Sequence, residues 1–101
     1  MGRHVLDDES GSTQESLLYW ERNRVKLGNI QKARCQQAGH LEVEGSLGVM
    51  QLRGLTCGYG GQGPQGTAEV LRDIGVPVKD AEELMGQIAF EVLVQCCAKG
   101  D

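Results

Sequence analysis

Apolar residues recur with a helical period after Ser12. Leu17, Trp20 and Leu27 fall on one stripe, as expected for a helix with one buried face. Ser12 followed three residues later by Glu15 is a capping box, which marks a helix start. Gly28 interrupts the pattern, but a weaker apolar face continues beyond it. We therefore predict helix over residues 13–38, with a break or kink at Gly28.

The period then changes from helical to alternating. Residues 40–44 alternate polar and apolar side chains, Gly45 and Ser46 offer a turn, and residues 47–55 form a second strand-like run. This pattern predicts a β-hairpin. Two short strands are not stable alone, so a third strand or a partner sheet should complete the hairpin.

Two helices are predicted in the C-terminal half. The first covers 67–74, with Thr67 as its N-cap and Gly75 after its end. Asp80 and Glu83 form a second capping box, and we extend the following helix over 81–98. Phe90, Val92 and Val94 also alternate as strand residues would, but the good helix formers at 81–85 favour helix. The prediction is an α+β fold: a flexible tail over 1–11 and one small domain over 12–101.

Composition and charge narrow the class of protein. The chain has 101 residues, of which 40% are apolar and 24% charged, as in globular domains with one core. It lacks an apolar run long enough to cross a bilayer, and residues 1–11 are polar and acidic, unlike a signal peptide. We expect a cytoplasmic protein without a membrane partner. The basic run over 21–34 would suit nucleic acid, but the net charge of −4 disfavours this partner.

A glycine-rich stretch over 54–67 holds six of the fifteen glycines. Gly58-x-Gly60-x-x-Gly63 matches the dinucleotide-binding pattern, yet the chain after it is too short for a doubly wound sheet. Backbone amides at a helix start could still hold a phosphate or carboxylate. The alternative is a loop that packs on the sheet edge or at an interface. The candidate ligand-binding residues are Gly58, Tyr59, Gly60, Gly61, Gly63, Gly66 and Thr67.

Catalytic chemistry has little support in this sequence. Cys57, near a predicted helix start, is the best candidate nucleophile, but it has no histidine partner nearby in the sequence. Cys35, His40 and Cys57 offer soft metal ligands without the spacing of a zinc site. We therefore predict no catalytic residues, no metal and no cofactor, and interpret the cysteines as small buried hydrophobes.

The leading hypothesis is a small non-enzymatic interaction or regulatory module that forms a homodimer. Its predicted interface residues are Trp20, Phe90 and Val94, because an aromatic near a helix start is typical of a core anchor or a dimer contact, and the C-terminal segment is the most apolar of the chain. The alternative hypothesis is a protein that binds a small anion or a nucleotide phosphate at 54–67.

Overall fold

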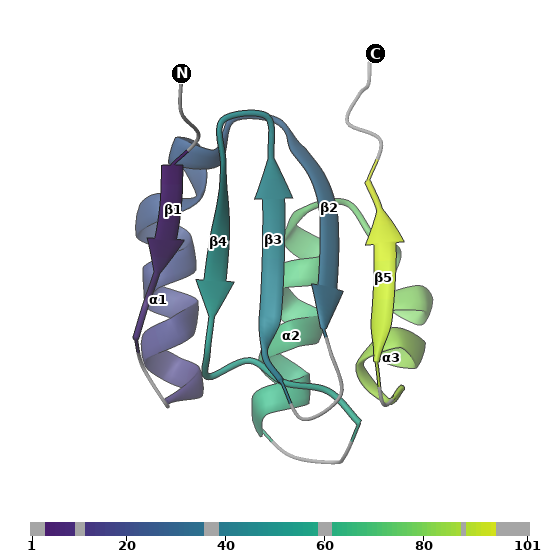
Figure 1. The fold of residues 1–101 in the computed structure, drawn as a ribbon. Coiled ribbons are helices and arrows are strands. Elements are labelled where there is room, and N and C mark those ends of the chain that lie inside the picture. The colour runs from purple at the N-terminus through teal and green to yellow at the C-terminus, as the bar shows by residue number, and fades with distance from the viewer. Residues whose placement is uncertain (1–3, 10–11, 36–38, 59–61, 88, 95–101) are drawn as a thin grey trace.

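The fold is described by a computed structural model that covers residues 4–9, 12–35, 39–58, 62–87 and 89–94. Helices and strands follow one another along the whole described chain (Figure 1). In order they are β1 (His4–Asp7), α1 (Thr13–Asn23), the 3₁₀ helix η1 (Arg24–Leu27), β2 (Ile30–Cys35), β3 (Leu41–Gly45), β4 (Gly48–Leu52), α2 (Gln62–Asp73), α3 (Val78–Met85) and β5 (Phe90–Leu93).

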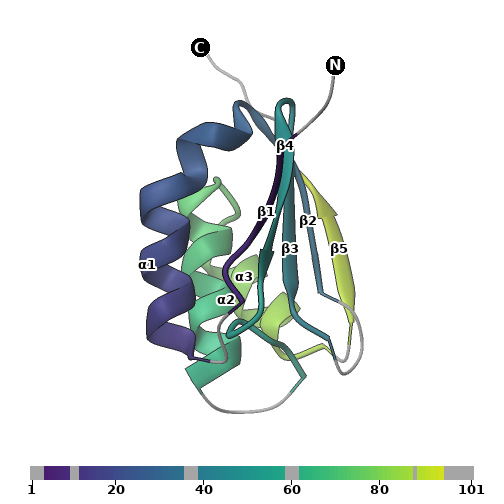
Figure 2. The ribbon, with the colours of Figure 1, turned by 60° about the vertical axis from the view of Figure 1, so that its left-hand side comes forward.

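The strands form one five-stranded sheet in the order β1-β4-β3-β2-β5. Neighbours are antiparallel except for β1 and β4, which are parallel. The helices all lie on one face of this sheet, so the described chain forms two layers (Figure 2). The predicted α+β fold class is confirmed, and the described part of the sheet's other face carries no helix.

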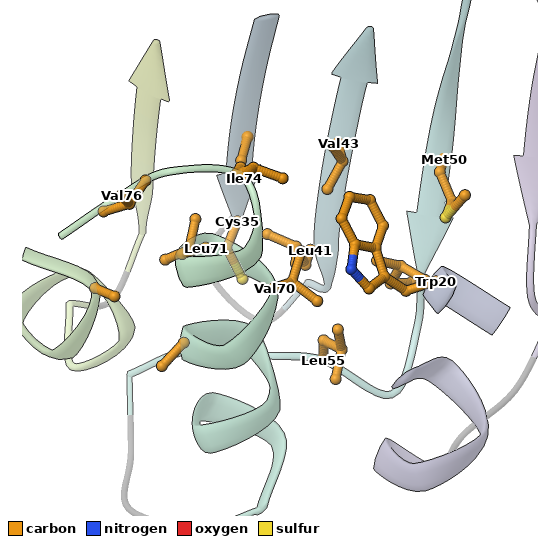
Figure 3. Close-up of a cluster of buried hydrophobic side chains, with 14 of the residues drawn as sticks. Trp20, Cys35, Leu41, Val43, Met50, Leu55, Val70, Leu71, Ile74 and Val76 are labelled. Atoms are coloured by element: carbon orange, nitrogen blue, oxygen red, sulfur yellow. The ribbon is translucent and has the colours of Figure 1, made fainter. Parts of the chain in front are cut away.

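The core fills the space between the sheet and the helices. Alternate residues of the strands point into it, where they meet Val70 and Leu71 of α2 and Ile74, which directly follows this helix (Figure 3). Trp20 of α1 is 1% exposed, and its indole N–H donates to Asp73 at the end of α2 over 3.1 Å. This bond satisfies the one polar atom of a buried tryptophan, so Trp20 joins α1 to α2.

The predicted helix over 13–38 is correct only in its first part. Its start is confirmed, since the Ser12 hydroxyl accepts a bond from the Glu15 N–H over 3.4 Å. The helical turns end at Gly28, whose φ of +72° suits glycine best. The prediction was wrong for residues 30–35, which form β2, and residues 36–38 lie outside the described part of the chain. Ala33 and Cys35 of β2 are buried while their neighbours are not, which is the alternation of a half-buried strand.

The predicted hairpin is confirmed as β3 and β4, which pair from Leu41 opposite Leu52 to Glu44 opposite Val49. The strands that complete it are β2 on one side and β1 on the other. The predicted tail over 1–11 was wrong in part, because residues 4–7 form β1, in register with Gly48–Gln51. Ser16 explains this docking: it is fully buried, and its hydroxyl donates to Asp8 and accepts from the Gly54 N–H.

The predicted C-terminal helix over 81–98 is correct only as far as Met85, and its residues 88 and 95–98 lie outside the described part of the chain. Helix α3 starts earlier, after Pro77, so Asp80 lies in its first turn rather than at its cap. It ends at Met85, and residues 90–93 form β5 against β2. The β-branched and aromatic residues of this segment prefer a strand when a partner strand is available. The predicted helix over 67–74 also starts earlier, at Gln62, while its predicted stop at Gly75 is confirmed by a φ of +106°.

Candidate interaction site at the open edge of the sheet

Among the described residues, β5 is the last strand of the sheet on the α3 side. Its Val94 N–H donates to the Gln31 carbonyl of β2 over 2.8 Å. In a strand the backbone groups of alternate residues point to opposite edges. The backbone groups of Phe90 and Val92 therefore point to β2, as those of Val94 do. The backbone groups of Glu91 and Leu93 point away from the sheet. This edge offers hydrogen-bonding groups to a further strand.

A hollow of about 500 Å³ lies beside this edge, between β5 and the segment that joins α2 to α3. Pocket volumes of 300–1,000 Å³ are typical of ligand sites. Apolar side chains contribute most of its walls, and Leu93, which is 76% exposed, lies at its rim. The lining residues are Gly75, Val76, Pro77, Asp80, Glu83, Leu84, Val92, Leu93 and Val94.

The polar part of the hollow is acidic. Asp80 and Glu83 line it from one face of α3, and neither forms an ion pair within the described residues. Glu91 lies on β5 itself and binds Lys32 over 3.2 Å. Residues 61–101 carry seven acidic and three basic side chains. A positively charged group would therefore find complementary charge here.

The open face of the sheet carries a different arrangement, in which the charges pair with one another. Arg34 donates to Glu42 over 2.5 Å, and Gln51 donates to the same carboxylate over 2.7 Å. A nitrogen of His40 lies 2.6 Å from the Gln51 side-chain oxygen. Together with Gly39, these side chains line a smaller hollow of about 200 Å³.

Lys32, the neighbouring cation on this face, also forms cross-strand ion pairs. Lys32 contacts Glu91 and, over 3.6 Å, Glu44. The hydrogen bond to Glu91 is the main cause of a raised pKa of Lys32, so the pair holds the ammonium in its charged form. Opposite charges on facing strand residues stabilise a sheet. This stabilising role explains why charged residues are present on the open face.

The glycine-rich stretch lies partly inside the protein. Gly63, Gly66 and Thr67 are buried within α2. A Cβ atom at Gly66 would lie 2.6 Å from a Leu55 methyl group, and the Thr67 hydroxyl donates to the Thr56 carbonyl over 2.6 Å. These contacts give the buried positions a packing role.

The remaining candidate ligand residues lie before α2. Gly58 is exposed, has a φ of +94°, and donates its N–H to the Met85 carbonyl over 2.9 Å. Tyr59, Gly60 and Gly61 lie outside the described residues. Anion binding at this stretch stays a prediction.

The three predicted interface residues have different positions. Trp20 is enclosed in the core of the chain, which leaves no surface for a second copy. Phe90 is 8% exposed and Val94 partly buried, and both side chains face the helices from β5 or directly after it. The exposed apolar residue of this strand is Leu93, which the sequence analysis did not select. A period of two applied to 90–94 would have identified it.

The other sequence candidates are brought together only in part. Cys35 and Cys57 meet on the core side of the sheet, whereas His40 lies in the hollow on the open face. A search of the described residues finds no cluster of three or more side chains suited to a metal ion. In the same part of the chain, no helix has the length and apolar character needed to span a membrane.

Comparison with protein-family models, with curated proteins and with solved structures finds no match to this chain. The function is therefore argued from the site.

Proposed function

We propose that this chain is a non-enzymatic interaction module that binds an extended segment of another polypeptide at the edge of β5. The observation that supports this most strongly is the juxtaposition of an outward-facing strand edge with an apolar hollow. Strand addition of this kind uses backbone hydrogen bonds for affinity and pockets for alternate side chains for specificity.

The register of β5 defines what such a segment contacts. The backbone of Glu91 and Leu93 pairs with it. Its side chains then alternate between the two sheet faces. Those on the helix side enter the hollow against Val76 and Leu84, and those on the open side lie beside Leu93.

Charge determines the class of partner. The carboxylates of Asp80 and Glu83 border the hollow, whereas the carboxylate of Glu91 on the strand is paired with Lys32. We therefore infer a partner segment in which lysine or arginine alternates with apolar residues. Pairing of β5 with β5 of a second copy would bring two acidic sites together. This repulsion disfavours the homodimer at low salt.

Selection from a display library of random short peptides tests the proposal, because it requires no known partner. The expected result is enrichment of sequences that combine basic and apolar residues, and that bind wild type in a fluorescence anisotropy assay. Enrichment of acidic sequences, or equal enrichment on a variant with both Asp80→Asn and Glu83→Gln, would overturn it.

The enriched peptide then allows matched variants to be compared. Removing both carboxylates should weaken binding about 2- to 30-fold, since each exposed ion pair contributes about 0.2–1 kcal/mol. Glu82→Gln removes the same charge from α3 but faces a different hollow, so its affinity should stay within about twofold of wild type.

A second pair of variants tests the backbone contacts. Leu93→Pro removes an outward N–H that β2 does not use, and proline is tolerated on edge strands. It should abolish peptide binding, whereas Leu93→Ala keeps the N–H and should retain most of it. Sedimentation at low and high salt tests whether a second copy of the chain, rather than a peptide, binds the β5 edge. A dimer that dissociates in the Leu93→Pro variant would favour the second copy.

A further inference from the structure

Two cysteines that are 22 positions apart in the sequence meet in the fold. Cys35 ends β2 and is 1% exposed. Cys57 lies between β4 and α2, is partly exposed, and packs against the core. The Cys35 side chain forms a hydrogen bond with that of Cys57, and neither residue is part of a disulfide. We propose that Cys35 and Cys57 are a redox-active pair that closes to a disulfide by exchange with a low-molecular-weight disulfide such as glutathione disulfide.

The exposure of the two sulfur atoms assigns their order of reaction. Cys57 is the accessible thiol, so its thiolate attacks the small disulfide, releases one small thiol and forms a mixed disulfide. Cys35 lies next to the Cys57 sulfur and attacks it, releasing the second small thiol. Two protein thiols and one disulfide thus become one protein disulfide and two thiols.

Burial explains why Cys35 acts second. Desolvation raises the pKa of the Cys35 thiol, and the neighbouring Cys57 adds to this effect. A buried thiol of this kind is a poor nucleophile toward molecules in solution. After the first exchange, the Cys57 sulfur of the mixed disulfide is held in contact with Cys35. A disulfide in solution is not held in this way, so Cys35 reacts with Cys57 instead.

The disulfide would join β2 to the beginning of the glycine-rich stretch. The next residue, Gly58, already donates its N–H to the end of α3. A crosslink between residues 35 and 57 restricts the unfolded chain. Oxidised protein should therefore melt at a higher temperature than reduced protein.

The test uses full-length protein in which Cys96 and Cys97 are replaced by serine, incubated in glutathione redox buffers and analysed by mass spectrometry. The expected product has lost two hydrogen atoms and carries no glutathione. Peptide mapping should place its disulfide between Cys35 and Cys57. Accumulation of glutathione on Cys57 without ring closure, or recovery of both thiols from the most oxidising buffer, would overturn the proposal.

Single variants then test the order of reaction. Cys35→Ala should retain one glutathione on Cys57, whereas Cys57→Ala should gain none while the protein is folded. Amide spectra recorded on the same samples establish that each variant is folded. Equal labelling of both variants in the folded state would contradict the assigned order.

Discussion

Gly54 begins the glycine-rich stretch and lies against the start of α1. A Cβ atom added to Gly54 would lie within 2.5 Å of the Ser12 carbonyl carbon and 2.7 Å of the Ser16 hydroxyl. The Ser12 carbonyl is backbone and also accepts the Ser16 N–H over 3.0 Å. It therefore has little freedom to move. We predict that Gly54→Ala destabilises the protein strongly.

The magnitude follows from two effects. Overpacking of a dense site costs about 1–3 kcal/mol, and contact with backbone favours the upper part of this range. The Gly54 carbonyl also accepts from the Thr13 hydroxyl over 2.9 Å, and its N–H donates to Ser16 over 2.8 Å. Weakening both bonds costs about 1 kcal/mol each. The expected loss is about 3–5 kcal/mol, a large part of the ~5–15 kcal/mol that stabilises a typical domain.

Urea denaturation followed by the fluorescence of Trp20, the only tryptophan of the chain, measures this loss directly. Gly86→Ala is the matched control, since its Cβ would approach no closer than 3.7 Å to the nearest atom. It should change the free energy of unfolding by less than about 0.5 kcal/mol. If Gly54→Ala unfolds at the same urea concentration as wild type, the close packing of α1 on Gly54 is refuted.

Three further predictions concern other contacts. Arg53 binds Asp7 and lowers the pKa of this carboxyl to about 2; stability from the pair is present above pH ~4 and lost as the pH falls toward 2. Arg53→Gln should raise the Asp7 pKa in a carboxyl NMR titration, and an unchanged value would contradict the contact. Asp73→Ala removes the acceptor of the Trp20 indole N–H and should cost about 1 kcal/mol in urea denaturation; no loss would contradict the bond. Amide shifts at Gly58 on adding inorganic phosphate would support the anion-site hypothesis, and unmoved amides would refute it.

The first helix and the hairpin could be predicted because their local signals agree with the fold. Ser12 and Glu15 mark the start of α1 from within three residues, and the strands of the hairpin are neighbours in sequence. The α+β class followed from these two elements. Local signals were sufficient here because each element contains its own period and its own cap.

The two strands that were predicted as helix, β2 and β5, share one physical cause: strand partners distant in sequence override local helix propensity. Residues 30–35 contain Gln, Lys, Ala and Arg, all adequate in helices, but they form the strand between β3 and β5. Val92 lies opposite Ala33, a partner 59 positions away. Nothing within either segment reveals this pairing.

The candidate site depends on the same long-range pairing. The hollow requires β5 to lie beside the segment from Gly75 to Pro77, and the cysteine pair requires β2 to lie beside Cys57. The sequence analysis selected Phe90 and Val94 by their apolar character, and these side chains face the helices. It omitted Leu93 because the helical period assumed for 81–98 does not distinguish this residue from its neighbours.

The most direct test of peptide docking is an NMR map of the isotope-labelled protein with the peptide enriched in the display selection. The account predicts amide shifts at Glu91 and Leu93, cross-strand contacts between these residues and the peptide backbone, and smaller shifts along the Asp80 and Glu83 face of α3. Shifts confined to the open face around His40, or to the glycine-rich stretch, would contradict the central claim that this module binds its partner at the edge of β5.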